Sequence, residues 1–456
     1  MDQANAVRTA PAKIVIIAFA LVALYVAGLI ALGPRISYQI WSTLVIGPGL
    51  FVVSLPILAR ESRRQNDRTL FWLLVAALAL KLLGAIVRYY ANIGLYGGTD
   101  ATAYYKSGLQ LAAQFRHGDF TGIRSLSGSD FVNFLSGLVL AGIGPTQLGG
   151  FVFFSWLGFW GLYLFYRAFM IGMPEGRSRS YARLLFFMPT LLFWPSEIGK
   201  EPWMMLTLGI GALGAALMLS GRTWRGLAVA ALGLWLAGFV RVHMSALMVV
   251  ALAAAYLFKR PRASLRQLAP IAKTVSAVAI AVLAVVFVKK AQAFLQQSGI
   301  NIQQGVGTAF SNLSTRTGGG GSAFAPSILQ SPTHAPIAFV TVLFRPFIFE
   351  ARNAQSLAAA LEGSFLLLFS VFRIRWFVAA LKSIRRQPYV AFALVYTLLF
   401  VAAYSGFSNF GTLARERSQV FPVYFVLFCV TPIETSGRRS RYRNELMSTP
   451  NGQRGK

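Results

Sequence analysis

Long apolar runs, separated by short polar segments, recur along almost the whole chain. About 20 apolar residues in a helix cross a bilayer, so the pattern predicts a bundle of membrane-spanning helices. The runs of suitable length are 13–32, 40–59, 69–89, 149–170, 181–197, 202–221, 225–240, 243–258, 270–288, 354–372, 388–405 and 418–433. An alternative for the pair over 225–258 is one bent hairpin that dips into the membrane and does not fully span it.

Two further apolar stretches predict helices that lie at the outer surface instead of crossing. The stretch 131–143 is too short for a bilayer, and 336–349 is interrupted by Arg345-Pro346. The fold class expected is therefore an all-α polytopic membrane protein with about twelve spans. The spans form one domain over 1–435, and a basic tail over 436–456 is expected to be disordered.

Composition supports a membrane protein and excludes other classes. Of 456 residues, 56% are hydrophobic and 12% are charged, which is about half the charge of a soluble domain. A net charge of +29 suggests a nucleic-acid partner for a soluble protein. Here the basic residues cluster between apolar runs, as in cytoplasmic loops, so no nucleic acid is expected. One cysteine, Cys429, and three histidines give no expectation of a disulfide, a metal site or a cofactor.

Orientation follows from the basic clusters, because cytoplasmic loops are enriched in lysine and arginine. Clusters occur at 60–68, 177–183, 259–266, 373–386 and 438–443. All of them face the cytoplasm if the two surface stretches do not cross, and both termini are then cytoplasmic.

This topology leaves two long outer segments, 90–148 and 289–353. The first is expected to carry an amphipathic helix near 101–117. The second contains the glycine run 318–321, which is either a mobile loop over a site or a loose connection.

Charged residues that interrupt the apolar runs fall on one predicted side of the membrane. They are Asp100, Glu197, Lys200, Glu201, Arg241, His243, Arg345, Glu350, Arg352, Arg415 and Arg417. Charge beside lipid is costly, so the pattern predicts one polar site at the outer mouth of the bundle. Arginines on the outer side oppose the usual bias, and their forked donors suit phosphate oxygens. An anionic ligand is predicted, and anionic lipid headgroups are the alternative.

Asp100 begins the first outer segment, in the sequence 97–105 that also contains Tyr104 and Tyr105. A carboxylate there is placed to take a proton from an attacking hydroxyl. An N-cap of the following helix is an equally good account from local sequence.

The turn 194–202 carries Glu197, Lys200 and Glu201 between two apolar runs. Lys200 is a candidate for phosphate, and the two glutamates for sugar hydroxyls. A solvated turn whose charges pair with each other is weighed equally.

These motifs resemble the GT-C-fold glycosyltransferases and Wzy-type bacterial polysaccharide polymerases. Asp100 after the third span is similar to the catalytic aspartate of the former. The turn 194–201 is similar to a W-S-S/G-K-D turn of the polymerases, and Arg345-Pro346 and Arg415-x-Arg417 look like their arginines. GT-C enzymes often have paired acidic residues, whereas Asp100 stands alone locally. Asp119 and Asp130, further along the segment, are the candidate partners.

The resemblance implies an enzyme that transfers a sugar from a polyprenyl-(pyro)phosphate carrier to a glycan acceptor. The reaction takes place at the outer face of the bacterial cytoplasmic membrane, within or beside an envelope-polysaccharide assembly complex. Asp100 is then the base, and Lys200, Arg241, His243, Arg345, Arg352, Arg415 and Arg417 bind the donor and its phosphate. The alternatives are a flippase of lipid-linked saccharides and a non-catalytic subunit of the complex.

Overall fold

The computed structural model describes residues 19–95, 97–259, 323–326 and 332–431, with isolated positions between 274 and 315. Over these residues the fold is all-α and has no sheet. Six of the described helices are long and apolar enough to cross a membrane, and a bent helix pair adds a seventh if counted as one span. The all-α prediction is confirmed over these residues, and the helices support a multi-pass membrane protein. The predicted span 270–288, the glycine run 318–321 and the tail 436–456 lie outside the continuously described ranges.

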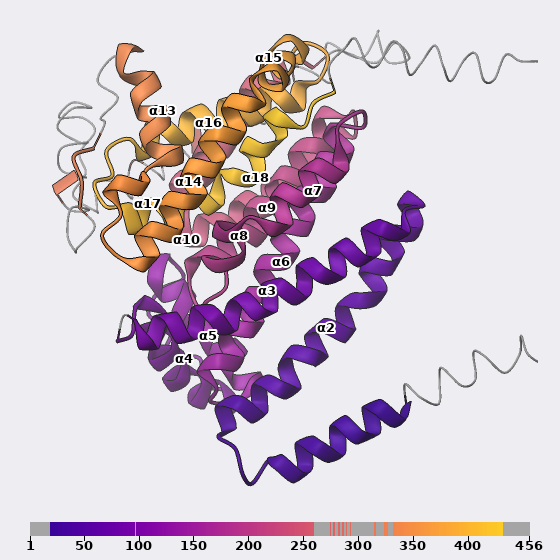
Figure 1. Ribbon diagram of the computed structural model, residues 1–456, viewed down its shortest axis with the longest axis vertical. Helices are drawn as coiled ribbons and strands as arrows, with labels where there is room; N and C mark the ends of the chain where they lie inside the picture. The colour runs from indigo at the N-terminus through magenta and orange to yellow at the C-terminus, as the bar shows by residue number, and fades with distance from the viewer. Residues whose placement is uncertain are drawn as a thin grey trace, which may run out of the picture. The chain divides into compact units, whose positions relative to one another are not determined.

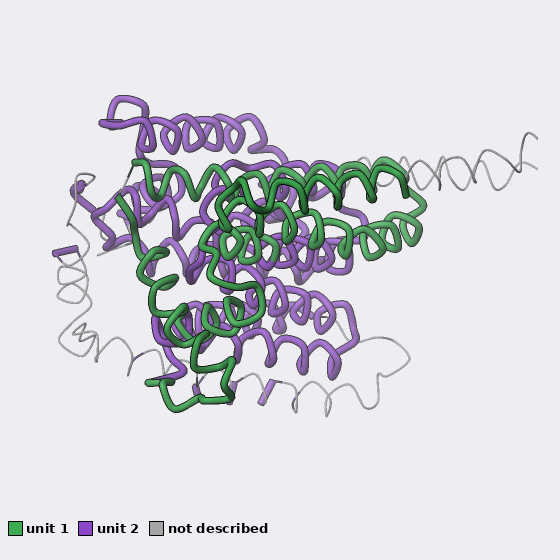
Figure 2. Tube along the Cα trace, turned by 90° about the horizontal axis from the view of Figure 1, so that it is seen from below, with its two compact units in different colours: residues 1–124, 133–156 green, residues 125–132, 157–456 purple. Residues whose placement is uncertain are grey.

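The chain divides into two compact units (Figure 2). Unit 1 comprises residues 1–124 and 133–156, and unit 2 comprises residues 125–132 and 157–456. Two helices run from one unit into the other: α5 (Gly128–Ile143) and α6 (Gln147–Gly172).

Unit 1 is built around an antiparallel pair of long helices, α2 (Tyr38–Gln65) and α3 (Arg68–Gly94), shown in Figure 1. The reversal between them uses Asn66 in the left-handed conformation, at a φ of 49°. Asp67 then caps α3 by accepting hydrogen bonds from the amides of Thr69 and Leu70. In the most apolar windows, only 17% of α2 and 39% of α3 is buried. Such exposed apolar surface is expected of helices that face lipid.

Helix α4 (Asp100–Arg116) completes unit 1 and confirms the helix predicted near 101–117. It packs closely against the unit 1 part of α5, because a Cβ added to Gly108 would lie only 2.6 Å from the Ser136 Cβ. The predicted surface stretch 131–143 is indeed helical and forms most of α5.

In unit 2, the segment after α6 is a broken helix, where a single span over 181–197 was predicted. The chain forms α7 (Ser178–Phe187) and then the short α8 (Pro189–Phe193). Pro189 explains the break, since proline has no amide hydrogen and restricts the residue before it to extended conformations. Met188 is extended, as this rule requires.

The next two helices, α9 (Lys200–Leu219) and α10 (Thr223–Leu257), are in close contact. Small residues allow this approach: a Cβ on Gly214 would lie 2.2 Å from the Ala230 amide nitrogen, and one on Gly233 would lie 2.4 Å from that of Gly211. Small-residue contacts are a common basis of helix association in membranes.

Helix α10 is a hairpin with arms 223–240 and 242–257. Arg241 has a non-helical backbone, with φ −141° and ψ 82°. The Lys259 Nζ donates to the Thr223 Oγ1 at 2.7 Å, although the ends of a straight 35-residue helix would lie about 50 Å apart. The Ser245 Oγ also donates to the Leu234 carbonyl at 2.8 Å. The chain therefore bends back at Arg241, as the bent-hairpin alternative for 225–258 predicted.

The rest of unit 2 contains η3 (Pro332–His334), α13 (Ala335–Phe344), η4 (Ile348–Glu350), α14 (Ala354–Phe372), α15 (Ile374–Ser383) and α16 (Pro388–Tyr404). Helices α15 and α16 are the bent pair, with an angle of 118°. The predicted surface stretch 336–349 is thus two short helices, α13 and η4.

The last predicted span, 418–433, is wrong as a continuous helix. The chain forms α17 (Phe410–Glu416), η5 (Arg417–Gln419), α18 (Phe421–Tyr424) and η6 (Phe425–Phe428). Residues 417–430 are all buried. The run is apolar because it fills the interior of unit 2, and hydropathy does not distinguish such a core segment from a lipid-facing helix.

Candidate functional site

The tip of the α10 hairpin presents an arginine to the interior of unit 2. Apolar residues surround Arg241 in the sequence, and the break in the helix places its side chain, which is only 9% exposed, opposite two carboxylates. The Arg241 Nη2 lies 3.0 Å from the Glu201 Oε1 and 2.6 Å from the Glu416 Oε1. A buried arginine is tolerated because both carboxylates compensate its charge.

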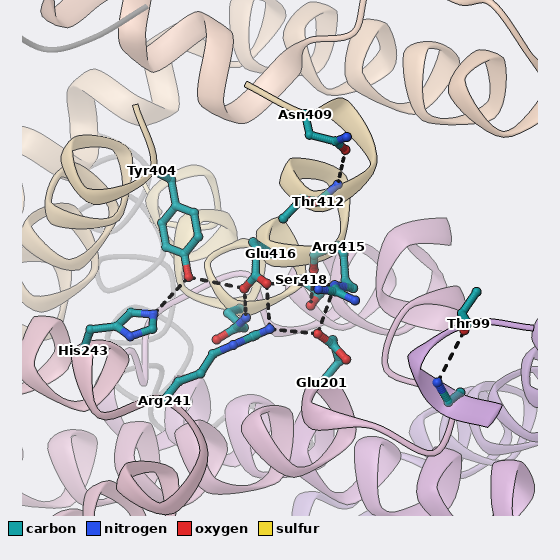
Figure 3. A network of polar contacts seen from close by, with 12 residues as sticks. Thr99, Glu201, Arg241, His243, Tyr404, Asn409, Thr412, Arg415, Glu416 and Ser418 are labelled. Atoms are coloured by element: carbon teal, nitrogen blue, oxygen red, sulfur yellow. Dashed lines mark hydrogen bonds and ion pairs between the residues drawn. The ribbon is translucent and has the colours of Figure 1, made fainter. Parts of the chain in front are cut away.

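Both carboxylates come from helix ends. Glu201 is the second residue of α9, and Glu416 is the last residue of α17. Helix α17 is begun by Asn409, whose side chain accepts from the Thr412 amide at 3.0 Å (Figure 3). A capped start fixes the helix and therefore the direction of its last residues.

Further side chains complete what we call the Arg241 cluster, drawn in Figure 3. The Arg415 Nε lies 3.2 Å from the Glu201 Oε1. The second oxygen of Glu416 accepts from the Tyr404 hydroxyl at 3.3 Å and from the Gln419 amide at 2.5 Å. The cluster consists of Glu201, Arg241, His243, Tyr404, Arg415, Glu416 and Gln419.

His243 joins this cluster through Tyr404. Its Nε2 lies 3.4 Å from the Tyr404 hydroxyl oxygen, and the two residues come from α10 and α16. The cluster thus connects α9, the break and second arm of α10, α16, α17 and η5. Two arginines face two glutamates, so the charges of the ion pairs cancel. This arrangement holds helices together more readily than it binds a further anion.

A second group of predicted residues lines an open cavity of about 290 Å³, which we call the Arg345 pocket. Its walls are Ala323, Phe324, Arg345, Phe349, Glu350, Arg352, Asn353, Ser356 and Phe410. The volume lies at the lower end of the range for small-molecule sites. It suits a phosphoryl group and part of a sugar better than a long glycan.

Aromatic rings support the arginine of this pocket. Phe324 and Phe410 stack with their ring centroids 4.1 Å apart and an interplanar angle of 5°. The guanidinium carbon of Arg345 lies 4.9 Å from the first ring centroid and 5.3 Å from the second. Cation–π contacts of this kind fix the guanidinium without using its hydrogen-bond donors.

The pocket has positive electrostatic character from two further sources. Arg352 lies in its wall, and α14 begins there, with the Asn353 side chain accepting from the Ser356 amide. The positive end of a helix dipole favours anions at such a position. One carboxylate opposes this: Glu350 accepts hydrogen bonds from Arg345 and from the Phe347 amide.

The contacts of Glu350 lower its pKa. Burial raises the pKa, but the hydrogen bonds from Arg345 and from the Phe347 amide outweigh this effect and hold it below its ordinary value. Glu350 is therefore ionised at neutral pH and partly compensates Arg345.

The cluster and the pocket lie at opposite ends of α17. Phe410 lines the pocket, whereas Arg415 and Glu416 belong to the cluster, and a helix of seven residues is about 10 Å long. The residues expected at one site therefore form two groups in unit 2.

The remaining predicted residues of unit 2 occupy other places. The Arg417 Nε donates to the Val342 carbonyl of α13 at 2.6 Å, and the residue is buried. Glu197 is 4% exposed and Lys200, half-buried, begins α9. The prediction of a solvated turn over 194–202 is wrong, because Trp194, Ser196 and Ile198 are buried as well. Burial of this turn is what allows Glu201 to reach Arg241 and Arg415.

In unit 1, Asp100 is the first residue of α4 and is exposed. The N-cap is Thr99, whose side chain accepts from the Ala101 amide at 3.4 Å. The alternative that Asp100 caps the helix is therefore wrong by one residue. Tyr104 is buried, and Tyr105 is half-buried, so that burial raises the pKa of Tyr105 while a hydrogen bond with Gln39 opposes the rise.

Three residues of the cluster were missed by the sequence interpretation: Tyr404, Glu416 and Gln419. Glu416 had a visible signal, since it is an acidic residue between Arg415 and Arg417 beside an apolar run. Tyr404 and Gln419 had none, because a tyrosine or glutamine near an apolar run is common.

Within the described residues, no group of three or more histidine, cysteine, aspartate or glutamate side chains is arranged to hold a metal ion. Comparison of the chain with protein-family models, with curated proteins and with solved structures finds no match in any of the three.

Proposed function

We propose that this chain is a multi-pass membrane glycosyltransferase or polysaccharide polymerase, similar to GT-C-fold and Wzy-type enzymes. It transfers a sugar from a polyprenyl-(pyro)phosphate carrier at the outer face of the bacterial cytoplasmic membrane. The observation that supports this most is the Arg345 pocket, where Arg345, Arg352 and the start of α14 surround an open cavity with aromatic walls. Arginine forks and helix N-termini both suit phosphoryl oxygens.

In the proposed reaction, Asp100 takes the proton of an acceptor hydroxyl as that oxygen attacks the anomeric carbon of the donor sugar. The bond between this carbon and the carrier phosphate breaks, and the phosphate leaves with the electron pair. The base is proposed for unit 1 alone. For unit 2 alone, we propose that Arg345 and Arg352 suit the negative charge of a departing phosphate. Asp100 is an exposed residue at the start of α4, which is consistent with this role.

The structure changes the roles proposed for the other arginines. Arg241 and Arg415 contact Glu201 and Glu416, so we assign them to holding the cluster together and not to binding phosphate. Lys200 remains a candidate for contacts to the donor, whereas His243 belongs to the Arg241 cluster through Tyr404. Partners in a polysaccharide assembly complex remain part of the proposal.

A flippase of lipid-linked saccharides is the second candidate, and one observation favours it. Transporters use discontinuous membrane helices at their binding sites, and α10 is broken at Arg241. The location of the accumulated precursor distinguishes the candidates. A strain without a flippase retains the lipid-linked precursor on the inner leaflet, whereas a strain without a transferase accumulates it on the outer leaflet.

The test is the output of polysaccharide and lipid-linked glycan in a deletion strain complemented with wild type or with variants. We expect Asp100→Asn and Arg345→Ala to be present in the membrane and to give no product. Glu175→Gln is the control for the first, because it removes one negative charge at an exposed position outside the proposed site. Arg375→Ala, at an exposed position in α15, is the control for the second. Full product from both test variants contradicts the proposal.

A further inference from the structure

Glu350 occupies the donor edge of Arg345 that a phosphoryl group would use. The Arg345 Nε lies 3.0 Å from the Glu350 Oε1 and 3.1 Å from the Oε2, and the Nη2 contacts the Oε1 as well. Two oxygens against one edge of a guanidinium is the same arrangement that a phosphate adopts on arginine.

The contact is local and is held by few other interactions. Glu350 lies five residues after Arg345, and its second oxygen also accepts from the Phe347 amide at 2.8 Å. The neighbouring Phe349 is 85% exposed and Ile348 is 53% exposed, so η4 has little packing around it. Rotation of the Glu350 side chain alone is enough to free the edge of Arg345, and such rotations are fast.

The charges of the pocket favour replacement of the Glu350 carboxylate by a phosphoryl group. Arg345 and Arg352 against Glu350 leave a formal excess of one positive charge in the walls. A phosphoryl group carries more negative charge than the carboxylate and has additional oxygens for Arg352 and for the start of α14. Departure of Glu350 also removes the like charge that an entering anion would meet.

We infer that Glu350 holds the place of an incoming phosphoryl group and is displaced from Arg345 when a phosphate or pyrophosphate binds. The inference rests on the proposed function, in which the same pocket holds the phosphate of the carrier. Glu350 is thus a competitor within the pocket. It compensates the charge of Arg345 while the pocket has no ligand, and a ligand binds only if it interacts with Arg345 more strongly than Glu350 does.

The test is the affinity of the full-length protein in detergent micelles for inorganic pyrophosphate, measured by titration calorimetry. Removal of the competitor, in Glu350→Gln and Glu350→Ala, is expected to tighten binding by about threefold or more, given the usual strength of partly exposed ion pairs. Glu175→Gln removes the same charge from an exposed position elsewhere in unit 2 and is expected to leave the affinity unchanged.

Unchanged or weaker binding in both Glu350 variants overturns the inference. Weaker binding means that Glu350 positions Arg345 for the ligand. Absence of pyrophosphate binding in every variant overturns it as well.

The complementation test of Arg345→Ala separates this inference from the proposed function. Tighter binding in the Glu350 variants, together with full product from Arg345→Ala, leaves an anion-exchange pocket without the proposed transferase. Unchanged binding together with loss of product leaves the transferase without the exchange.

Discussion

The Arg241 cluster and the Arg345 pocket contain the same chemistry, arginine against glutamate, in two different environments. In the cluster, the side chains of Arg241 and Glu416 are 9% and 5% exposed. In the pocket, those of Arg345 and Glu350 are 21% and 16% exposed and border an open cavity. The cluster balances its charges and joins several helices, whereas the pocket keeps a positive excess and joins residues only five apart. Burial and sequence separation, and not residue type, therefore distinguish a structural ion pair from one available to a ligand.

The largest difference is expected when each glutamate is removed. Glu416→Ala leaves a buried arginine without one of its two carboxylates and is expected to reduce the free energy of unfolding by about 3–5 kcal/mol. Glu350→Ala removes a partly exposed pair and is expected to cost about 1 kcal/mol or less. Thermal unfolding of both variants in the same detergent makes the comparison, and equal melting temperatures would contradict it.

The arginines are expected to separate stability from binding. Arg352→Ala removes a charge from the wall of the pocket, so we expect pyrophosphate affinity to fall by about tenfold, as for loss of one charge-assisted hydrogen bond. The melting temperature is expected to stay within about 2 °C of wild type. Arg241→Ala is expected to lower the melting temperature strongly. If the Arg241→Ala protein were stable but no longer bound pyrophosphate, the Arg241 cluster and not the Arg345 pocket would be the anion site.

Salt is expected to affect the two groups unequally. At 0.5 M instead of 0.05 M sodium chloride, screening weakens contacts with solvent-exposed charge, so pyrophosphate affinity is expected to fall severalfold. The buried cluster is screened much less, so the difference in melting temperature between wild type and Glu416→Ala is expected to persist. Loss of that difference at high salt would show that solvent reaches the cluster.

The smallest effect is expected from pH, through Glu350. Its pKa is lower in the folded protein than the ordinary value, so its ion pair contributes stability above about pH 4.3, the unfolded value, and loses it as the pH falls through the folded value. Because the pair is partly exposed, the loss between pH 5 and pH 3 is expected to stay below about 1 kcal/mol. It is expected to be absent in Glu350→Gln, and an equal loss in both proteins would assign it to other carboxylates.

Hydropathy predicted most of the helices but not their continuity. The stretches 40–59, 69–89, 149–170 and 354–372 lie within single helices, because a long apolar run without proline favours an unbroken helix. Proline inside α2 is the exception, since Pro48 and Pro56 do not interrupt it. The stretches 181–197 and 418–433 break into short elements. Their residues are largely buried within unit 2. A segment in contact with lipid must be a continuous helix to pair its backbone groups, whereas a segment packed inside protein need not be.

The sequence pointed to several charged residues but not to their pairing. Charges beside apolar runs drew attention to Glu201, Arg241 and Arg415, and the structure brings these three together as ion pairs. The partner Glu416 is 175 residues from Arg241 in the sequence, and no local pattern connects two positions so far apart. Local sequence was also insufficient at Asp100, because the residue that caps α4 is the neighbouring Thr99.

The separation of Arg241 from Glu416 has a consequence for biogenesis. The hairpin of α9 and α10 is complete long before Glu416 is synthesised, since 175 residues separate the pair. At ordinary translation rates of about 5–20 residues per second, roughly 10–35 s pass between the two. During that interval Arg241 has Glu201 but lacks its second carboxylate. The Arg241 cluster is therefore complete only when α17 arrives, and a chain truncated before α17 carries an incompletely compensated arginine.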